Sequence, residues 1–284
     1  MATIWLDGTW CDRSTAMISV YDHGLLYGDG VFEGIRAYDG RIFRLAEHVE
    51  RLYDSAHAIG LVVPMSQAEF CRITEETLSR SGLKDAYLRP IVTRGVGDLG
   101  LDPRKCPKPS VIIIVDTIKL WGPEVYAKGL RVVTAGTPIP QREALSPRVK
   151  SLNYLPHIMA KMEGVHAGAD EVLMLDAAGH VAEGSGQNLF LVKKGVVKTP
   201  PPHSGILKGV TRDAVIELAL EGGYRLEEVI LNRYDVYTAD EAFFTGTAAE
   251  LVAIREVDGR AIGSEMPGPV TRDLHARFHA LVRR

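Results

Sequence analysis

The chain has 284 residues, enough for about two domains of ordinary size. Hydrophobic residues make up 46% of the chain and charged residues 24%, which is the balance of a globular protein and excludes disordered, fibrous and membrane-embedded classes. The formal net charge of −3 offers no bulk attraction to nucleic acid or to an anionic membrane, so we expect small-molecule partners and neither of those two.

The three cysteines, Cys11, Cys71 and Cys106, have no CxxC spacing and predict neither a disulfide framework nor a thiolate metal site. We therefore expect no metal and a reducing, cytoplasmic location. The opening stretch MATIWLDGTWCDRS lacks the basic and apolar segments of a signal peptide, and the longest apolar run, Val111 to Val115, is far shorter than the roughly 20 residues of a membrane span. We expect no export or anchoring.

Strand and helix patterns alternate along the first part of the chain. Apolar residues recur about every 3.6 residues in 45–59, which predicts a helix with one buried face, and Gly82 is typical of a helix end. Asp39-Gly40 is a strong hairpin turn signal. The expected strands are 3–6, 30–38, 41–43, 86–92 and 110–118, the expected helices are 45–59 and 66–81, and 95–109 is expected to be a long loop.

Gly122-Pro123 interrupts this pattern, so we expect an N-terminal α/β domain at 1–118, an interdomain loop at 119–129 and a C-terminal α/β domain at 130–284. In the second half the expected strands are 130–134, 171–176, 189–193, 195–198, 242–245 and 251–257, and the expected helices are 155–168 and 211–221. The mixture predicts an α/β (α+β) protein in two domains.

Two segments combine small and polar residues in the first half and at the start of the second. In YGDGVFEGIRAY, three glycines (Gly28, Gly30 and Gly34) interrupt a strand pattern, which indicates a bulge, a close approach by ligand or backbone, or a twisted edge strand. In SPRVKSLNYL, Lys150 precedes a helix among apolar neighbours. Most lysines are solvated charges, but a desolvated amine can serve as a nucleophile.

Three further segments lie downstream of this lysine. In HVAEGSGQNLFLV, Glu183 sits in a tight turn and either points inward or faces solvent. In ILKGVTRDAVIELA, a helix begins near Val210-Thr211, and in FFTGTAAEL a small-residue turn follows a strand. Exposed backbone amides at a helix start bind anions. Two such turns indicate a ligand with a phosphate and a second ligand with a carboxylate.

In this order the segments resemble the fold-type IV family of pyridoxal-phosphate enzymes, and most closely the class IV branched-chain amino acid aminotransferases. The stretches that carry the resemblance are YGDGVFEGIRAYDGRIFRLAEHVERLYDSA, AYLRP, VKSLNYL, GADEVLML, VAEGSGQNLF, GVTRDA and GTAAEL, which together reach from residue 27 to about 251. The resemblance implies the two-domain architecture of D-amino-acid aminotransferases, with pyridoxal 5'-phosphate (PLP) between the domains.

The resemblance also implies roles for individual residues. Lys150 would hold PLP as a Schiff base, the internal aldimine, and move the proton between the substrate's α-carbon and the cofactor. Glu183 would face the pyridine nitrogen and keep it protonated. Arg51 would bind the phosphate, the alternative being a helix-surface ion pair with Glu47. The remaining cofactor ligands implied are Tyr154 at the phenolic oxygen, and Val210, Thr211, Gly246 and Thr247 around the phosphate.

On the substrate side, the resemblance implies that Tyr87 and the Ala248-Ala249 amides hold the α-carboxylate. Arg89 would bind the distal carboxylate of glutamate or 2-oxoglutarate, the alternative being a cap on the sheet edge. The other pocket positions implied are Tyr27, Phe32 and Arg36.

Two residues depart from the family pattern. Gln187 stands where these enzymes usually carry glutamate, and Pro156 replaces a residue that is commonly asparagine. Because a later proline would lose a helical hydrogen bond, Pro156 must fall in the first turn of its helix or kink it.

The expected reaction is ping-pong transamination, in which an L-branched-chain amino acid (leucine, isoleucine or valine) gives its amino group to PLP and 2-oxoglutarate takes it up. A homodimer, or an assembly of dimers, is expected from the family. Three alternatives stay open: a D-amino-acid or (R)-amine aminotransferase, a 4-amino-4-deoxychorismate lyase, and a catalytically silent binding protein on the same fold.

Overall fold

The computed structural model describes residues 3–283, which divide into two compact units. Unit 1 extends to Ile118 and also includes Val149–Asn153, whereas unit 2 comprises Lys119–Arg148 and the chain from Tyr154 onward. The segment with Lys150 therefore groups with the first half of the chain. The expectation that this lysine belongs to the C-terminal domain is wrong, because its backbone is hydrogen-bonded to a strand and a helix of unit 1, as described below.

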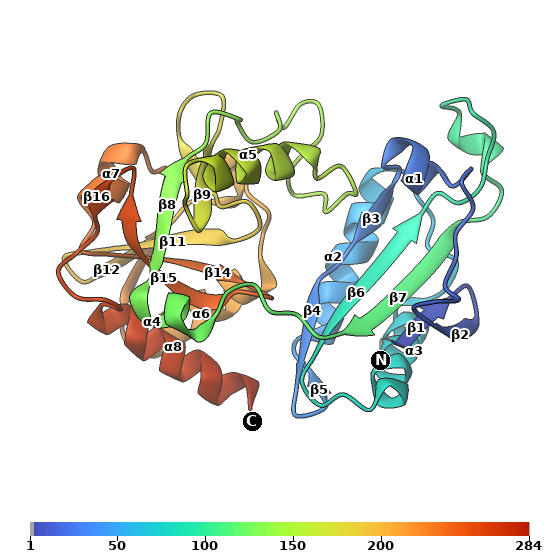
Figure 1. Cartoon of the computed structure of the whole chain (residues 1–284), viewed down its shortest axis with the longest axis horizontal. Coiled ribbons are helices and arrows are strands. Elements are labelled where there is room, and N and C mark those ends of the chain that lie inside the picture. Colours follow the sequence, from blue (N-terminus) through green and yellow to red (C-terminus); the bar gives the residue numbers. More distant parts are fainter. Residues whose placement is uncertain (1–2, 284) are drawn as a thin grey trace. The chain divides into compact units, whose positions relative to one another are not determined.

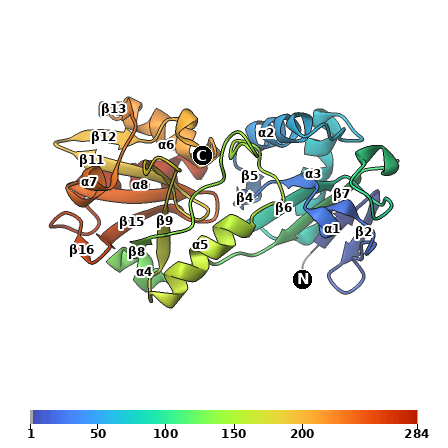
Figure 2. The same cartoon turned by 90° about the horizontal axis from the view of Figure 1, so that it is seen from above.

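Unit 1 is built on a seven-stranded antiparallel sheet with the strand order β2-β1-β7-β6-β4-β5, in which β3 also pairs with β6 (Figure 1). Its helices α2 and α3 lie together on one face of that sheet (Figure 2). The strands are β1 (Thr3–Leu6), β2 (Thr9–Asp12), β3 (Gly30–Phe32), β4 (Ile35–Tyr38), β5 (Arg41–Ile42), β6 (Ala86–Thr93) and β7 (Ser110–Asp116). The helices are α1 (His23–Tyr27), α2 (Leu45–Ala58), α3 (Gln67–Ser81) and the 3-10 turn η1 (Pro103–Lys105).

Several local predictions for unit 1 are confirmed. The helix expected at 66–81 is α3, and Gly82 ends it at a φ of 68°, as predicted; the structure adds that the Ser66 side chain caps its first turn. Asp39-Gly40 joins β4 to β5 with both residues at positive φ. The expected strand 30–38 is instead divided into β3 and β4 at Glu33. The Glu33 N–H donates to the Pro90 carbonyl, but Pro90 has no N–H to return.

Unit 2 is built on nine strands in the order β10-β9-β8-β15-β14-β11-β12-β13, with β16 on β15. An additional pairing of β10 with β11 closes six of these strands into a circuit. The strands are β8 (Leu130–Thr134), β9 (Glu171–Leu175), β10 (Val181–Glu183), β11 (Asn188–Lys193), β12 (Val196–Thr199), β13 (Arg225–Glu228), β14 (Glu241–Gly246), β15 (Glu250–Val257) and β16 (Arg260–Ala261). The helices are α4 (Pro123–Lys128), α5 (Leu155–His166), α6 (Val210–Glu221), α7 (Arg233–Tyr237), α8 (Pro269–Val282) and the turn η2 (Pro202–Ser204).

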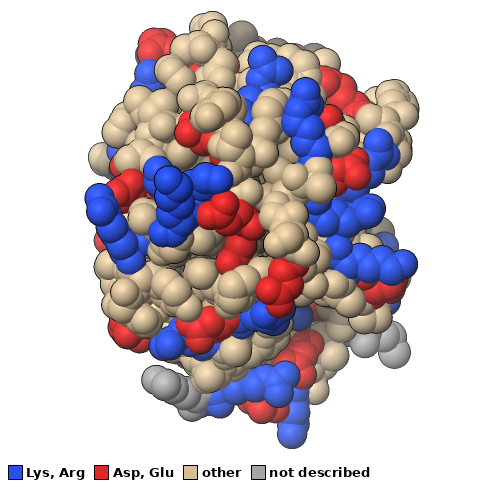
Figure 3. Space-filling model, turned by 90° about the vertical axis from the view of Figure 1, so that its left-hand side faces the viewer, with Lys and Arg blue, Asp and Glu red and all other residues tan. Residues whose placement is uncertain are grey.

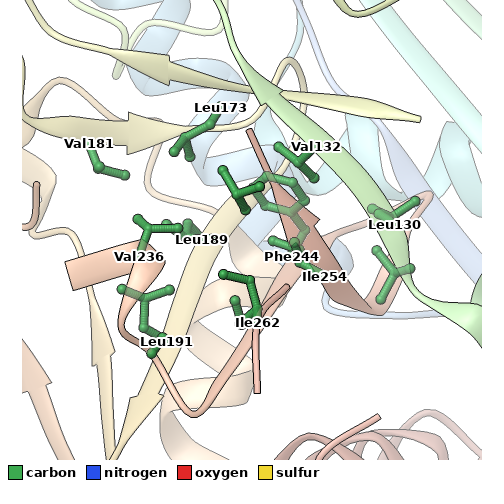
Figure 4. Close-up of a cluster of buried hydrophobic side chains, with 14 of the residues drawn as sticks. Leu130, Val132, Leu173, Val181, Leu189, Leu191, Val236, Phe244, Ile254 and Ile262 are labelled. Atoms are coloured by element: carbon green, nitrogen blue, oxygen red, sulfur yellow. The ribbon is translucent and has the colours of Figure 1, made fainter. Parts of the chain in front are cut away.

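The main core of unit 2 lies within this circuit of strands, where side chains from all six strands converge (Figure 4). Alternate residues of a strand point to the same side, so each strand contributes its inward-facing apolar positions. The six strands supply Leu130, Leu173, Val181, Leu189, Phe244 and Ile254, all buried. In unit 1, the face of α2 predicted from periodicity is confirmed, because Val49, Leu52 and Ala56 pack against the sheet.

The expected interdomain loop at 119–129 is corrected by the structure. Gly122-Pro123 starts a helix there, α4, with the proline in its first turn, where its missing N–H costs nothing. Trp121, Val125 and Tyr126 pack against the core of unit 2, so the segment is part of that unit. Elements that the sequence did not predict are β2, β10, β13, β16, α1, α4, α7 and α8.

Within residues 3–283, no helix is long and apolar enough to cross a membrane. The same residues hold no group of three or more His, Cys, Asp or Glu side chains that could bind a metal ion. On the face of unit 2 that Figure 3 shows, Lys and Arg side chains are interspersed with Asp and Glu, and most of the remaining area is uncharged.

Candidate active site

The segment 149–153 lies as an added strand along β3. The Phe32 N–H donates to the Lys150 carbonyl at 2.9 Å, and the Leu152 N–H donates to the Gly30 carbonyl at 2.9 Å. On its other side, the Lys150 N–H donates to Oγ of Ser55, a buried residue of α2, at 3.1 Å. Both backbone groups of Lys150 are therefore held by unit 1, which fixes the root of its side chain.

Two of the three glycines of YGDGVFEGIRAY, Gly28 and Gly30, leave the space that this segment occupies. A Cβ on Gly30 would lie 2.7 Å from Leu152 Cδ1 and 2.6 Å from the Val92 carbonyl oxygen, and a Cβ on Gly28 would lie 2.9 Å from Asn153 Oδ1. Gly28 also has a φ of 72°, which disfavours other residues. The close approach predicted from the sequence is therefore made by the Leu152 and Asn153 side chains and by the backbone of β6 at Val92.

Around Lys150, unit 1 gathers Phe32, Tyr87 and Arg89. Lys150 Nζ lies 4.6 Å from the centre of the Phe32 ring, and Arg89 Cζ lies 4.8 Å from the same ring centre. Arg89 Nη2 donates to the Tyr87 hydroxyl at 2.9 Å, while its buried Nε has no partner among the described residues. A Cβ on Gly34 would overlap the Tyr87 hydroxyl, so this glycine makes room for the tyrosine.

Arg51 forms a two-pronged ion pair with Glu33, a residue that sequence reasoning did not single out. Arg51 Nε and Nη2 lie 2.7 and 2.8 Å from the two carboxylate oxygens, and His48 Nδ1 lies 2.8 Å from Oε2. Glu33 is fully buried. Burial raises the pKa of Glu33, but the neighbouring Arg51 and His48 outweigh it and leave the pKa well below the ordinary carboxyl value.

Burial is also the main cause that lowers the pKa of His48, although Glu33 opposes it. The imidazole is therefore neutral at neutral pH, and it donates through Nδ1 to the Glu33 carboxylate. A fixed carboxylate thus orients the guanidinium of Arg51, whose side chain is still 15% exposed. An arginine held in this way is preorganised to bind an anion.

The other two predicted pocket residues of unit 1 lie on neighbouring elements. Tyr27 ends α1, and its hydroxyl donates to the Leu99 carbonyl at 2.6 Å. Arg36 lies on β4 opposite Tyr87, with its guanidinium carbon 5.1 Å from the Tyr38 ring centre. These contacts do not involve Lys150, so the place of both residues in a pocket stays a prediction.

In unit 2, Glu183 is the last residue of β10 and is buried, so the alternative of a solvent-facing acid is wrong. Its Oε2 accepts from Asn188 Nδ2 at 3.0 Å and from the Leu207 N–H at 3.1 Å, while Oε1 lies 3.9 Å from His157 Nε2. The two donors hold this buried carboxyl group in a fixed place.

Tyr154 and His157 stand beside this acid at the start of α5. Their rings stack with centres 4.6 Å apart and an interplanar angle of 22°. Pro156 falls in the first turn of the helix, as predicted. Sequence reasoning missed His157, although a spacing of three residues from Tyr154 puts both side chains on one helical face. Buried His157 Nδ1 has no partner among the described residues.

Gln187 belongs to a polar network around the buried Glu171. Gln187 Nε2 donates to Glu171 Oε2 at 3.3 Å, Ser185 Oγ donates to Oε1 at 2.6 Å, and Lys161 Nζ lies 2.9 Å from Oε2. A glutamate at 187 would place a second carboxylate against Glu171. Gln187 fits this place because an amide can donate to Glu171 where a carboxylate cannot.

The structure has a helix start and a strand-to-strand turn at the two places where anion binding is predicted, both in unit 2. Helix α6 begins at Val210, one residue earlier than predicted, after Gly209, which offers no side-chain cap to the first turn. The second turn, 247–249, joins β14 to β15, with Gly246 paired to Glu250. Strand pairing puts Glu183 opposite Asn188 and Asn188 opposite Thr245, next to this turn.

The predicted cofactor residues thus form two sets, each assembled within one unit. Unit 1 brings Lys150 and Phe32 together and orients Arg51. Unit 2 brings Tyr154, Glu183 and the 247–249 turn onto adjoining elements. The start of α6 lies near them, because Leu207, three residues before the helix, donates its N–H to Glu183. Each set by itself offers groups of the kind that PLP needs: an anchored amine and an oriented arginine in unit 1, and a buried acid and a helix start without a side-chain cap in unit 2.

Comparison with known proteins gives a consistent result. A family model described as amino-transferase class IV matches residues 30–257. A Methanocaldococcus jannaschii protein is 50% identical over 97% of this chain and 94% of its own length, and the branched-chain-amino-acid aminotransferase of Pseudomonas aeruginosa is 41% identical over 98% of this chain and 92% of its own.

Solved structures agree. The branched-chain amino acid aminotransferase of Escherichia coli has a TM-score of 0.96 and 36% identity, covering 99% of this chain and 94% of its own. The branched-chain amino acid aminotransferase from Thermobaculum terrenum, solved in its PLP-form, has a TM-score of 0.88 and 30% identity, covering 99% of this chain and 93% of its own.

The fold and the residue sets define an aminotransferase. The chain belongs to the class IV aminotransferase family, and the recognition made from its motifs is confirmed, as is the mixed α/β fold.

Proposed function

We propose that this chain catalyses PLP-dependent transfer of the amino group of L-leucine, L-isoleucine and L-valine to 2-oxoglutarate by a ping-pong mechanism. The observation that carries the proposal is the anchoring of Lys150, held by its backbone on both sides in a chain that is similar over nearly its whole length to branched-chain aminotransferases. A lysine whose backbone is fixed can return its side-chain amine to the same position in every catalytic cycle.

PLP, when bound, supplies an electron sink for the negative charge that develops at the substrate's α-carbon. Lys150 attaches the cofactor and carries the proton to and from that carbon. Glu183 keeps a fixed negative charge toward the ring nitrogen, and Tyr154 holds the phenolic oxygen. The phosphate ligands proposed are Arg51, Val210, Thr211, Gly246 and Thr247.

Substrate recognition is proposed to use aromatic and cationic groups of unit 1 together with the Ala248 and Ala249 amides. Tyr87 and the two amides hold the α-carboxylate, while Tyr27, Phe32 and Arg36 line the pocket. Arg89 binds the distal carboxylate of 2-oxoglutarate. Its buried Nε, which has no partner among the described residues, supports this role because a carboxylate would satisfy it.

The test is a substrate panel with purified protein. We expect turnover of the three L-branched-chain amino acids with 2-oxoglutarate, and loss of turnover in Lys150→Ala with the fold retained by circular dichroism. Preference for D-leucine or an (R)-amine would overturn the stereochemical assignment, and pyruvate release from 4-amino-4-deoxychorismate without an amino acceptor would identify a lyase. Failure to bind PLP would favour the alternative of a catalytically silent binding protein on this fold.

Arg89→Gln tests the pocket separately. Because a hydrogen bond to a charged group contributes about 1.5–3 kcal/mol, the KM for 2-oxoglutarate should rise roughly tenfold to a hundredfold. The KM for leucine should change less, since leucine has no distal carboxylate. Arg80→Gln, which removes an exposed ion pair with Glu76, is the control. An equal rise for both substrates would contradict the assignment.

A homodimer in the cytoplasm is part of the proposal. Large apolar side chains of unit 1 are exposed, namely Met17, Val20, Leu25, Leu99 and Leu101, and a pocket of about 350 Å³ lies beside Met17. Exposed apolar surface of this kind marks an association site. All three cysteines are unpaired, which fits a reducing compartment. Light scattering of the purified protein and cell fractionation test the two statements.

A further inference from the structure

The turn 247–249 is followed directly by a residue with an unusual backbone conformation. Glu250, the first residue of β15, has a φ of 55°, in the left-handed region. Three-residue hairpin loops commonly carry a left-handed residue at their end, and glycine is the residue that adopts this conformation without steric cost. A glutamate here indicates that its side chain has a use that offsets the strain.

The Glu250 side chain reaches the last turns of α8. Its Oε2 lies 3.3 Å from His279 Nε2, and its side chain is 12% exposed. A carboxylate only accepts, so His279 Nε2 is the donor. His275, one turn earlier on α8, faces the same nitrogen with its own Nε2 at 3.2 Å. Burial, with the nearby His279, lowers the pKa of His275, although Glu250 opposes this, so His275 is neutral at neutral pH.

Strands β14 and β15 form a hairpin around this turn, and the start of α8 is bound to β14. Glu241, the first residue of β14, accepts from the Val270 N–H at 3.0 Å, the Thr271 N–H at 2.8 Å and Thr271 Oγ1 at 2.6 Å, which caps the start of α8. The helix also packs along α6 (Figure 1). The start of α8 is therefore tied to the first residue of β14, and its C-terminal end to the first residue of β15, directly after the turn.

We propose that Glu250 is a positioning residue: through His279 it holds the turn 247–249 in the conformation that presents the Thr247 hydroxyl and the Ala248 and Ala249 amides to phosphate and carboxylate groups. This inference rests on the proposed function, which makes those groups ligands. Because Glu250 meets His279 through its side chain, the effect of that contact reaches the turn through the Glu250 backbone.

The decisive variant is Glu250→Gly, because it removes the carboxylate and at the same time relieves the left-handed backbone. A residue needed only for folding would lower the melting temperature and leave affinity unchanged. A positioning residue does the opposite: we expect an unchanged or higher melting temperature of the apoprotein, together with an increase of about tenfold in the Kd for PLP and in the KM for leucine.

His279→Gln should reproduce the loss of affinity, and Glu250→Gln, which keeps an acceptor oxygen, should restore part of it. The double variant Glu250→Gly with His279→Gln should be no worse than Glu250→Gly alone, since both changes break one contact. Arg272→Gln, also on α8, is the matched control, because it removes an exposed ion pair with Glu265, which precedes the helix. Multiplicative losses in the double variant, or an unchanged Kd and KM in Glu250→Gly, would overturn the proposal.

Thr247→Val separates this inference from the proposed function. Fluorescence titration of the apoprotein with PLP is the readout for all variants, so catalysis is not needed. If Thr247→Val leaves the Kd for PLP unchanged, the turn is no phosphate ligand and the proposed function fails at this point. If Thr247→Val weakens PLP binding while the Glu250 and His279 variants do not, only the positioning role is overturned.

Discussion

Lys150 and Phe32 are joined twice, by a hydrogen bond from the Phe32 N–H to the Lys150 carbonyl at 2.9 Å and by the approach of Lys150 Nζ to within 4.6 Å of the Phe32 ring centre. The first contact fixes the backbone of the lysine, and the second places its amine over an aromatic face. An ammonium is attracted to such a face, so the two contacts together restrict where the amine can lie.

Gly30→Ala should displace this lysine. The added Cβ would meet the Val92 carbonyl oxygen at 2.6 Å and Leu152 Cδ1 at 2.7 Å, so the 149–153 segment must shift or the strand must strain. We expect a loss of stability of about 1–3 kcal/mol by chemical denaturation. We also expect less PLP attached to Lys150, measured by mass spectrometry after borohydride reduction. Gly136→Ala, where the nearest atom would be 3.4 Å away, should change neither quantity.

Acid should destabilise unit 1 through Glu33 and His48. Both groups have a folded-state pKa below the ordinary value. A lowered folded-state pKa means that the unfolded chain binds protons more readily than the folded chain. The contribution of each group to the free energy of unfolding is therefore present at neutral pH. The contribution of His48 is lost as the pH falls below about 6.5, and that of Glu33 as it falls below about 4.3.

His48→Asn tests the first part of that loss, because asparagine can still donate to Glu33 but does not titrate. The free energy of unfolding should fall less steeply with acidification below about pH 6.5 than in the parent protein. His57→Asn, on the same helix, is the control. A parent protein whose stability rises on mild acidification would contradict the assignment.

Glu183→Gln should lower activity while preserving the fold. The amide keeps the size of the side chain but removes the charge that Asn188 and the Leu207 N–H hold in place. Turnover with leucine should fall by at least about tenfold, on the scale of a charged hydrogen bond of about 1.5–3 kcal/mol. Glu163→Gln, a carboxylate that binds the 136–137 loop instead, should keep its turnover number. Equal effects of the two variants would argue against a role at the cofactor.

Gln187→Glu should be destabilising at neutral pH, by about 1–3 kcal/mol, because it puts a second buried carboxylate beside Glu171. The deficit should shrink on acidification as one of the two acids takes up a proton. Adding Glu171→Gln should recover part of the stability, since one amide and one acid are again paired. A Gln187→Glu protein as stable as the parent at every pH would show that the two side chains do not interact.

Local features were determined by the sequence alone. The buried face of α2, the end of α3 at Gly82 and the Asp39-Gly40 hairpin follow from spacing, helix-end and turn chemistry within a few residues. The motifs around Lys150, Glu183 and the two turns were enough to identify the family, because their residue types and order are specific even when each motif is weak by itself.

Tertiary structure alone decided which residues those motifs meet. The grouping of Lys150 with unit 1, the Glu33 support of Arg51, the His157 contact with Glu183 and the tie between Glu250 and His279 all join residues that are far apart in the chain. Periodicity reports which face of an element is buried, but not which element covers it. Pairing of buried charges depends on that covering element, so these contacts could not be predicted from the sequence.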